Sequence, residues 1–140
     1  MPKTKAKAKP HSPPNQEVTL PNIRPDAHHV IKCGPGYVVH LRAEREDMVL
    51  SWVDPNLDLC LISLDQAAEL RTPISGTTQL QDEHGARVKV PIVRFEVIIG
   101  AKAVKMTAAV DPLLVQTTGR HFVVGCDLFL KSKEMGVLML

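Results

Sequence analysis

From residue 30 onward, the chain alternates short apolar or β-branched runs with turn-forming residues. Runs of this length with this composition are typical of strands. The pattern predicts eight strands, over 37–42, 48–53, 59–62, 77–81, 87–93, 95–99, 103–110 and 122–124. So many short strands in so short a segment indicate an all-β domain, either a closed barrel or a sandwich.

Two stretches interrupt this pattern and predict short helices. Ser63 and Gln66 have the spacing of a capping box, in which the hydroxyl accepts a backbone bond and the glutamine reaches back. The helix that they open should end before Pro73. A second helix is expected near 127–134, ending at Gly136.

The segment 77–93 predicts a hairpin that turns at 82–85, where Gly85 can adopt a positive φ. Its strands are long for a small domain, so the hairpin either projects from the core or forms an ordinary meander. Beyond the second helix, residues 137–140 are all apolar. Such a run needs a partner, either in a sheet across a subunit interface or within its own monomer.

Composition changes sharply at the start of the chain. With 140 residues, 44% of them hydrophobic, the chain has room for one modest domain. Residues 1–14 combine prolines and lysines with no large apolar side chain after Met1, so they cannot offset the entropy of becoming ordered. We therefore expect a disordered basic tail or linker over 1–27 and a single domain over 28–140.

The formal net charge of +2 comes mostly from that tail, which leaves the body near neutrality. A neutral body argues against a folded surface built to bind nucleic acid. The tail lysines could contact phosphates, although without interleaved aromatic residues they are a weak signal. No apolar run approaches the roughly 18 residues of a membrane-spanning helix, and no signal-peptide core follows the lysines, so we expect no membrane partner.

The chain has three cysteines, Cys33, Cys60 and Cys126, which are too widely spaced for a disulfide framework or a paired-cysteine zinc site. This spacing predicts reduced thiols in an intracellular, cytoplasmic protein. His28 and His29 with Cys33 could form one corner of a metal site, but no second pair lies at zinc-finger spacing. We therefore expect neither a metal nor a cofactor.

Asp54 follows an apolar run and precedes Pro55-Asn56. A carboxylate at the tip of a buried strand-turn-strand is costly without partners. It is either a simple Asx turn or a functional group. Val-Asp-Pro recurs at 110–112, but the sequence after Pro112, Leu-Leu-Val-Gln-Thr-Thr-Gly, predicts no repeat of the strand and helix that follow Pro55. A pair formed by Asp54 and Asp111 within one chain is therefore disfavoured.

The run Val123-Val124-Gly125-Cys126-Asp127 predicts a strand-to-helix junction. Gly125 permits close approach of another backbone, and Asp127 can cap the helix.

From about residue 36 onward, the chain resembles the retropepsin-like aspartic proteases, a single-lobed family of retroviruses, retrotransposons and some cellular and bacterial proteins. Residues 53–63 align without a gap with the family pattern Val-Asp-Thr-Gly-Ala-Ser and its following strand, which ends in Leu-Ile-Ser. Further segments that match in the expected order are 67–70, 82–85, 90–93, 99–100, 108–111 and 123–129.

This resemblance implies a closed β-barrel lobe with one or two short helices that supplies one catalytic residue, Asp54. Two copies must then form a homodimer, in which like-charge repulsion lets the two carboxyl groups share a proton. The implied substrate is an extended polypeptide, such as a retroelement polyprotein. The implied roles are an active-site loop at Pro55, Asn56, Leu57 and Asp58, a flap at His84, Gly85 and Ala86, and support of the loop by Gly125 and Asp127.

The sequence departs from the family pattern directly after the aspartate. The usual Thr or Ser and Gly are replaced by Pro55 and Asn56, and Pro55 has neither a hydroxyl nor an N–H to bond across a dimer. An alternative is therefore a catalytically impaired pseudoprotease that serves as a dimerisation or peptide-binding module. A third reading is an unrelated small β-barrel that binds nucleic acid through its lysine tail.

Overall fold

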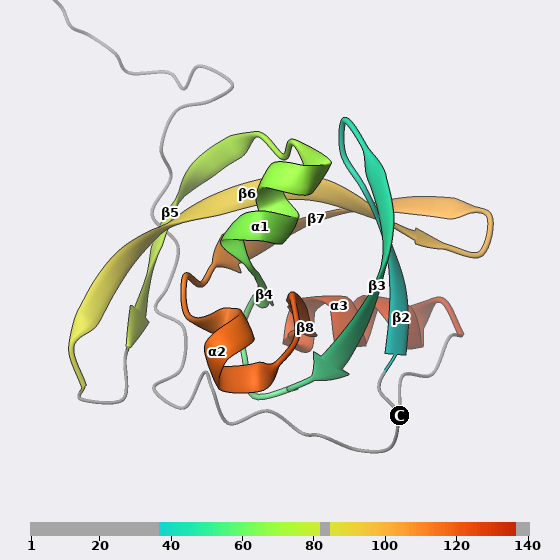
Figure 1. Ribbon diagram of the computed structural model, residues 1–140. Coiled ribbons are helices and arrows are strands. Elements are labelled where there is room, and N and C mark those ends of the chain that lie inside the picture. Colours follow the sequence, from blue (N-terminus) through green and yellow to red (C-terminus); the bar gives the residue numbers. More distant parts are fainter. Residues whose placement is uncertain (1–36, 82–84, 137–140) are drawn as a thin grey trace, which may run out of the picture.

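The computed structural model describes residues 37–81 and 85–136, and the labels used here are those of Figure 1. The strands are β2 (Tyr37–Arg42), β3 (Glu46–Val53), β4 (Cys60–Ile62), β5 (Ile74–Gln81), β6 (Arg87–Ile99), β7 (Lys102–Val110) and β8 (Phe122–Val124). The helices are α1 (Leu64–Leu70), α2 (Leu114–Thr118) and α3 (Cys126–Glu134). The tail over 1–27, the apolar run 137–140, His28, His29 and Cys33 lie outside the described residues.

Strand pairing closes a barrel. Within the described ranges, the strands follow the order β2-β3-β8-β4-β7-β6-β5, and an additional pairing of β2 with β6 closes a ring of six that leaves β5 outside (Figure 1). The prediction of a closed β-barrel with short helices is therefore confirmed.

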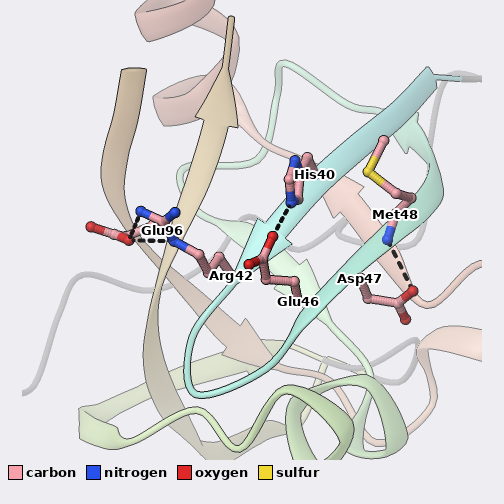
Figure 2. Close-up of polar contacts among 6 residues, drawn as sticks. All are labelled: His40, Arg42, Glu46, Asp47, Met48 and Glu96. Atoms are coloured by element: carbon pink, nitrogen blue, oxygen red, sulfur yellow. Dashed lines mark hydrogen bonds and ion pairs between the residues drawn. The ribbon is translucent and has the colours of Figure 1, made fainter. Parts of the chain in front are cut away.

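The junction between β2 and β6 carries a side-chain ion pair on the outside of this ring. Arg42 Nη2 and Nε donate to Glu96 Oε1 at 2.7 and 3.0 Å. Figure 2 shows Arg42 reaching from β2 toward Glu96 on β6, beside the His40–Glu46 contact at 2.7 Å. Because both pairs are partly exposed, we attribute barrel closure mainly to the strand ladder.

Two apolar clusters occupy the two faces of the short central strands. β4 and β8 are buried at every position. Their side chains point alternately into the barrel and out of it, and an apolar cluster covers each of these two faces. The inner cluster includes Cys60, Ile62, Phe95, Phe122 and Val124. The outer cluster consists of Leu57, Leu61, Leu80, Val90, Ala109, Leu114 and Val123.

The hairpin of β5 and the first part of β6 extends away from the helices in Figure 1. Leu80 and Val90 from this hairpin nevertheless belong to the outer apolar cluster, together with Leu57. Because Leu80 pairs with Val88 close to the turn, the hairpin packs with the segment that follows Asp54 through the part near its turn.

Some predicted elements need correction. The strands expected over 87–93 and 95–99 form one strand, because Arg94 pairs with Thr107 and stays exposed while both neighbours are buried. Helix α2 was not predicted. Three of its five residues, Val115, Thr117 and Thr118, are β-branched and weak helix formers, but Leu114 is fully buried and the Thr118 hydroxyl donates to the Leu114 carbonyl at 2.7 Å.

Two segments contain the same order of elements. β3, a turn beginning with Asp54-Pro55, β4 and α1 correspond to β7, a turn beginning with Asp111-Pro112, β8 and α3. β3 pairs in parallel with β8 and β7 pairs in parallel with β4, while the antiparallel β4–β8 pair lies between them. The expectation that the segment after Pro112 lacks this repeat was wrong, because α2 lengthens the second connection and hides the repeat in the sequence.

Candidate functional site

Asp54 lies directly after the last residue of β3 and is fully buried in the single chain. Parallel pairing of Val53 with Val124 fixes the direction in which the strand ends. The Asp54 amide then donates to the Val124 carbonyl at 2.8 Å. The position of this aspartate therefore follows from the β3–β8 ladder.

A tight turn surrounds the Asp54 side chain. The Asn56 amide donates to Asp54 Oδ1 at 3.0 Å, and the Leu57 amide donates to the Asp54 carbonyl at 3.1 Å. The Asx turn suggested by the sequence is therefore present. Asn56 keeps a negative φ, since Arg71 alone has a positive φ among the non-glycine residues that the structure describes. An amide thus reaches the carboxylate without a glycine at this position.

The β8–α3 junction holds the far end of this turn. The Cys126 amide donates to the Leu57 carbonyl at 2.7 Å. A Cβ at Gly125 would lie 2.5 Å from the Leu59 carbonyl oxygen and 2.9 Å from the Cys60 amide nitrogen. The predicted close backbone approach at Gly125 is confirmed, and it occurs against the strand that leads out of the turn.

Behind the turn, a buried thiol contacts a carboxyl group. The Cys60 thiol donates to Asp127 Oδ1 at 3.4 Å, and the Gly125 amide donates to the Cys60 sulfur at 3.4 Å. Burial, followed by the nearby Asp127 charge, raises the pKa of the Cys60 thiol well above its ordinary value. Cys60 is therefore a protonated structural thiol, which agrees with the interpretation from its apolar surroundings.

Asp127 does not cap α3, although the sequence predicted that it could. The N-cap of α3 is Gly125, with no side-chain cap bond, and Asp127 lies in the first turn. Its Oδ1 accepts the Leu128 amide at 2.7 Å. Burial raises the pKa of the Asp127 carboxyl, although the bonds from the Leu128 amide and the Cys60 thiol act in the opposite direction. Its link to Cys60 joins positions 67 apart in sequence, which sequence spacing could not reveal.

The other predicted site residues are distributed around this turn and the hairpin. Pro55 is half-buried, and Asp58 is exposed, as expected for a carboxylate with a secondary role. Gly85 has φ +84°, as the turn required, and Ala86 is exposed beside it. His84 lies outside the described residues.

Asp111 occupies a turn of the same geometry at the opposite end of β8. Its Oδ1 accepts the Leu113 amide at 2.9 Å, and its own amide donates to the Ile62 carbonyl at 3.0 Å. Ile62 pairs with Phe122 at the start of β8, whereas Asp54 bonds to Val124 at its end. The structure therefore places the two aspartates apart, and a shared site within one chain is not formed.

Two histidines that could have approached a metal are engaged elsewhere. His40 Nε2 lies 2.7 Å from Glu46 Oε1, and His121 Nδ1 lies 2.8 Å from Ser63 Oγ. Across 37–81 and 85–136, no group of three or more His, Cys, Asp or Glu residues could hold a metal ion.

None of the helices in these two ranges has the length and apolar character needed to cross a membrane. The chain matches no protein-family model and no curated protein sequence. The interpretation of the site therefore depends on its geometry and on the sequence pattern around it.

Proposed function

We propose that the chain is a retropepsin-like aspartic endopeptidase that acts as a homodimer on extended polypeptide segments. The observation that carries this proposal is the turn at Asp54, a carboxyl group at the end of a barrel strand whose Oδ1 accepts the Asn56 amide at 3.0 Å. Bonds to Val124 and Cys126 hold the two ends of this turn. Such pre-positioning is what acid–base catalysis requires of a carboxylate.

The chemistry needs one Asp54 from each subunit. When two carboxyl groups lie within a few ångströms, repulsion between like charges lets the pair hold a single proton. The ionised carboxylate takes a proton from water as the water oxygen attacks the peptide carbonyl carbon. The protonated partner donates its hydrogen bond to the carbonyl oxygen, and the amide nitrogen leaves with a proton as the C–N bond breaks.

Cleavage of a peptide library by the full chain, followed by mass spectrometry between pH 3 and pH 7, tests this proposal. Asp54→Asn should abolish cleavage without unfolding the protein, because the amide cannot act as the base. Asp58→Asn is the matched control, since this exposed carboxylate lies four residues further on and should be dispensable. Absence of cleavage from dimeric wild-type protein at every pH would overturn the proposal.

A second candidate function is a pseudoprotease that dimerises or binds peptides. Two observations favour it. Pro55 offers neither a hydroxyl nor an N–H for a bond between the two active-site turns. Asp54 is also fully buried in the single chain, and a carboxyl group that meets neither water nor substrate cannot activate either.

Restoring the family residues distinguishes the two candidates. The double variant Pro55→Thr, Asn56→Gly regains a hydroxyl and an amide at the turn. If the native protein binds but does not cut a peptide and this variant cuts it, the chain is a pseudoprotease. If both proteins cut and Asp54→Asn does not, the chain is a peptidase.

A further inference from the structure

A large groove lies apart from the Asp54 turn. It has a volume of about 880 Å³ and is bounded by the β2–β3 turn, the end of α1, strands β6 and β7, and helix α3. Pockets for small organic ligands typically measure about 300–1,000 Å³. Asp127, which lies behind the Asp54 turn, lines one side of the groove, but none of residues 54–57 does, so the groove does not open onto the Asp54 turn.

The lining combines apolar side chains with an excess of positive charge. Its apolar members are Ala43, Leu59, Pro73, Phe95 and Met106. The charged members are Arg42, Arg71, Arg94, Lys105 and Lys131 against Glu44, Glu96 and Asp127. A site of this composition favours a ligand that has both an apolar part and a negative charge.

Two of the three acidic residues are already neutralised by partners within the groove. Glu96 accepts from Arg42 at 2.7 Å, and Glu44 accepts from Arg71 at 3.0 Å. These pairs remove two negative charges, together with two positive ones, from the groove. A cationic ligand would have to compete with arginine for both carboxylates.

The third acidic residue is also a poor partner for a cation. Asp127 Oδ1 already accepts the Leu128 amide at 2.7 Å and the Cys60 thiol at 3.4 Å. Burial raises the pKa of this carboxyl, because it disfavours the charged form. The carboxylates of the groove therefore offer little to a positive ligand.

The uncompensated charge is positive. Arg94 and Lys105 are exposed, and among the residues described neither forms an ion pair. Arg94 pairs with Thr107 and Lys105 with Glu96, so the two cations are diagonal neighbours on the same face of the β6–β7 ladder. Residues in this relation lie about 7–8 Å apart, which is close enough for one acidic group to contact both long side chains.

We propose that this groove binds a small amphipathic organic anion, whose acidic group contacts Arg94 and Lys105 and whose apolar part lies against Leu59 and Pro73, two of the accessible apolar residues of the lining. This inference is independent of peptidase activity, because it uses no residue of the Asp54 turn. Binding combines burial of the apolar part with charge-assisted hydrogen bonds to the two cations.

Calorimetric titration of the full chain with decanoate tests the proposal, with decanol as the uncharged analogue. Decanoate should bind at least about tenfold more tightly than decanol, and the difference should shrink as salt is added. Arg94→Gln and Lys105→Gln should each weaken decanoate binding about tenfold and leave decanol binding unchanged. Lys102→Gln is the matched control, since Lys102 is an exposed cation on the same strand that does not line the groove.

Amide chemical-shift mapping then locates the bound decanoate. The largest shifts should fall on residues 94–96, 105–107 and 127–131 in both the wild-type protein and the Asp54→Asn variant. The proposal is wrong if decanoate does not bind, if decanol binds equally well, or if Arg94→Gln and Lys105→Gln leave the affinity unchanged. It is also wrong if the shifts cluster instead on Val38, Met48 and Leu50, the exposed apolar residues of β2 and β3.

Discussion

Gly125 is required for space rather than for backbone conformation. Its φ of −95° is accessible to any residue, but an added Cβ would lie 2.5 Å from the Leu59 carbonyl oxygen. Because the neighbouring atoms belong to the backbone of Leu59 and Cys60, they cannot move aside as a flexible side chain would. Gly125→Ala should therefore lower the free energy of unfolding by about 3 kcal/mol or more, as measured by urea denaturation.

Gly100→Ala is the control for that experiment. Gly100 has φ +61° and open space around the position of its missing Cβ, so alanine there costs only backbone strain, about 1 kcal/mol. Equal effects of the two substitutions would show that the junction behind the Asp54 turn can move apart, and that Gly125 does not hold it in place.

Asp127 should make stability depend on pH. Burial raises its pKa in the folded chain, so the folded state binds this proton more tightly than the unfolded state does. The stabilisation is complete below the unfolded value of about 3.9 and is lost as the pH rises through the folded pKa. This group therefore makes the protein less stable as the pH increases across that window.

Asp127→Asn should remove this contribution. The asparagine oxygen can still accept the Leu128 amide and the Cys60 thiol, but the side chain carries no charge at any pH. In denaturation series from pH 3 to pH 8, the variant should gain stability relative to wild type as the pH rises. A constant difference across the series would contradict the assignment of a raised pKa to this residue.

At the scale of single elements, helix α1 depends on its two ends. Ser63 Oγ accepts the Gln66 amide at 3.0 Å and lies 2.8 Å from His121 Nδ1. The reciprocal half of the predicted capping box is absent, because the Gln66 side chain donates to Asp47 Oδ2 at 3.2 Å instead. Ser63→Ala should cost about 1–2 kcal/mol, since it removes both contacts of the hydroxyl.

At the other end of α1, we expect a substitution to have the opposite effect on the free energy of unfolding. Arg71 forms the C-cap with φ 57°, a left-handed conformation that favours glycine. Its ion pair with Glu44 is exposed and contributes little. Arg71→Gly should therefore leave stability unchanged or raise it by about 1 kcal/mol in the denaturation assay used for Ser63→Ala. A loss as large as that of Ser63→Ala would show that the Arg71 side chain matters more than its backbone conformation.

The sequence was most informative where local pattern and burial agree. The bounds of β2 and β8 were predicted without error, because apolar and β-branched runs there end at turn residues. α2 was missed because tertiary burial of Leu114, rather than helix propensity, holds it. The continuity of β6 was missed because one exposed arginine inside a buried strand looks like a break in the sequence.

The candidate site could be predicted only in its local part. The Asx turn at Asp54 follows from an aspartate, a proline and an asparagine in succession. The bonds that hold this turn join it to Val124 and Cys126, about 70 residues away in the chain, and the Gly125 backbone lies close against Leu59. Such contacts depend on which strands are neighbours, and β8, the last of the described strands in the sequence, lies between β3 and β4 in the sheet.

At the scale of the whole molecule, the internal repeat limits what one chain can do. It produces two buried aspartates in equivalent turns, Asp54 and Asp111, at opposite ends of β8. Neither can complete a two-carboxylate centre with the other. If the protein is an aspartic peptidase, its second carboxylate must come from another copy of the chain.

Peptidase activity should therefore depend on association. We expect sedimentation equilibrium to show a monomer–dimer equilibrium, and cleavage per mole of chain to fall on dilution in proportion to the dimer fraction. Asp54→Asn should associate like wild type, and mixing it with wild-type chains should reduce activity further than simple dilution, because a mixed dimer has one carboxylate. Activity per chain that stays constant down to concentrations at which only monomer sediments would contradict a centre shared between two subunits.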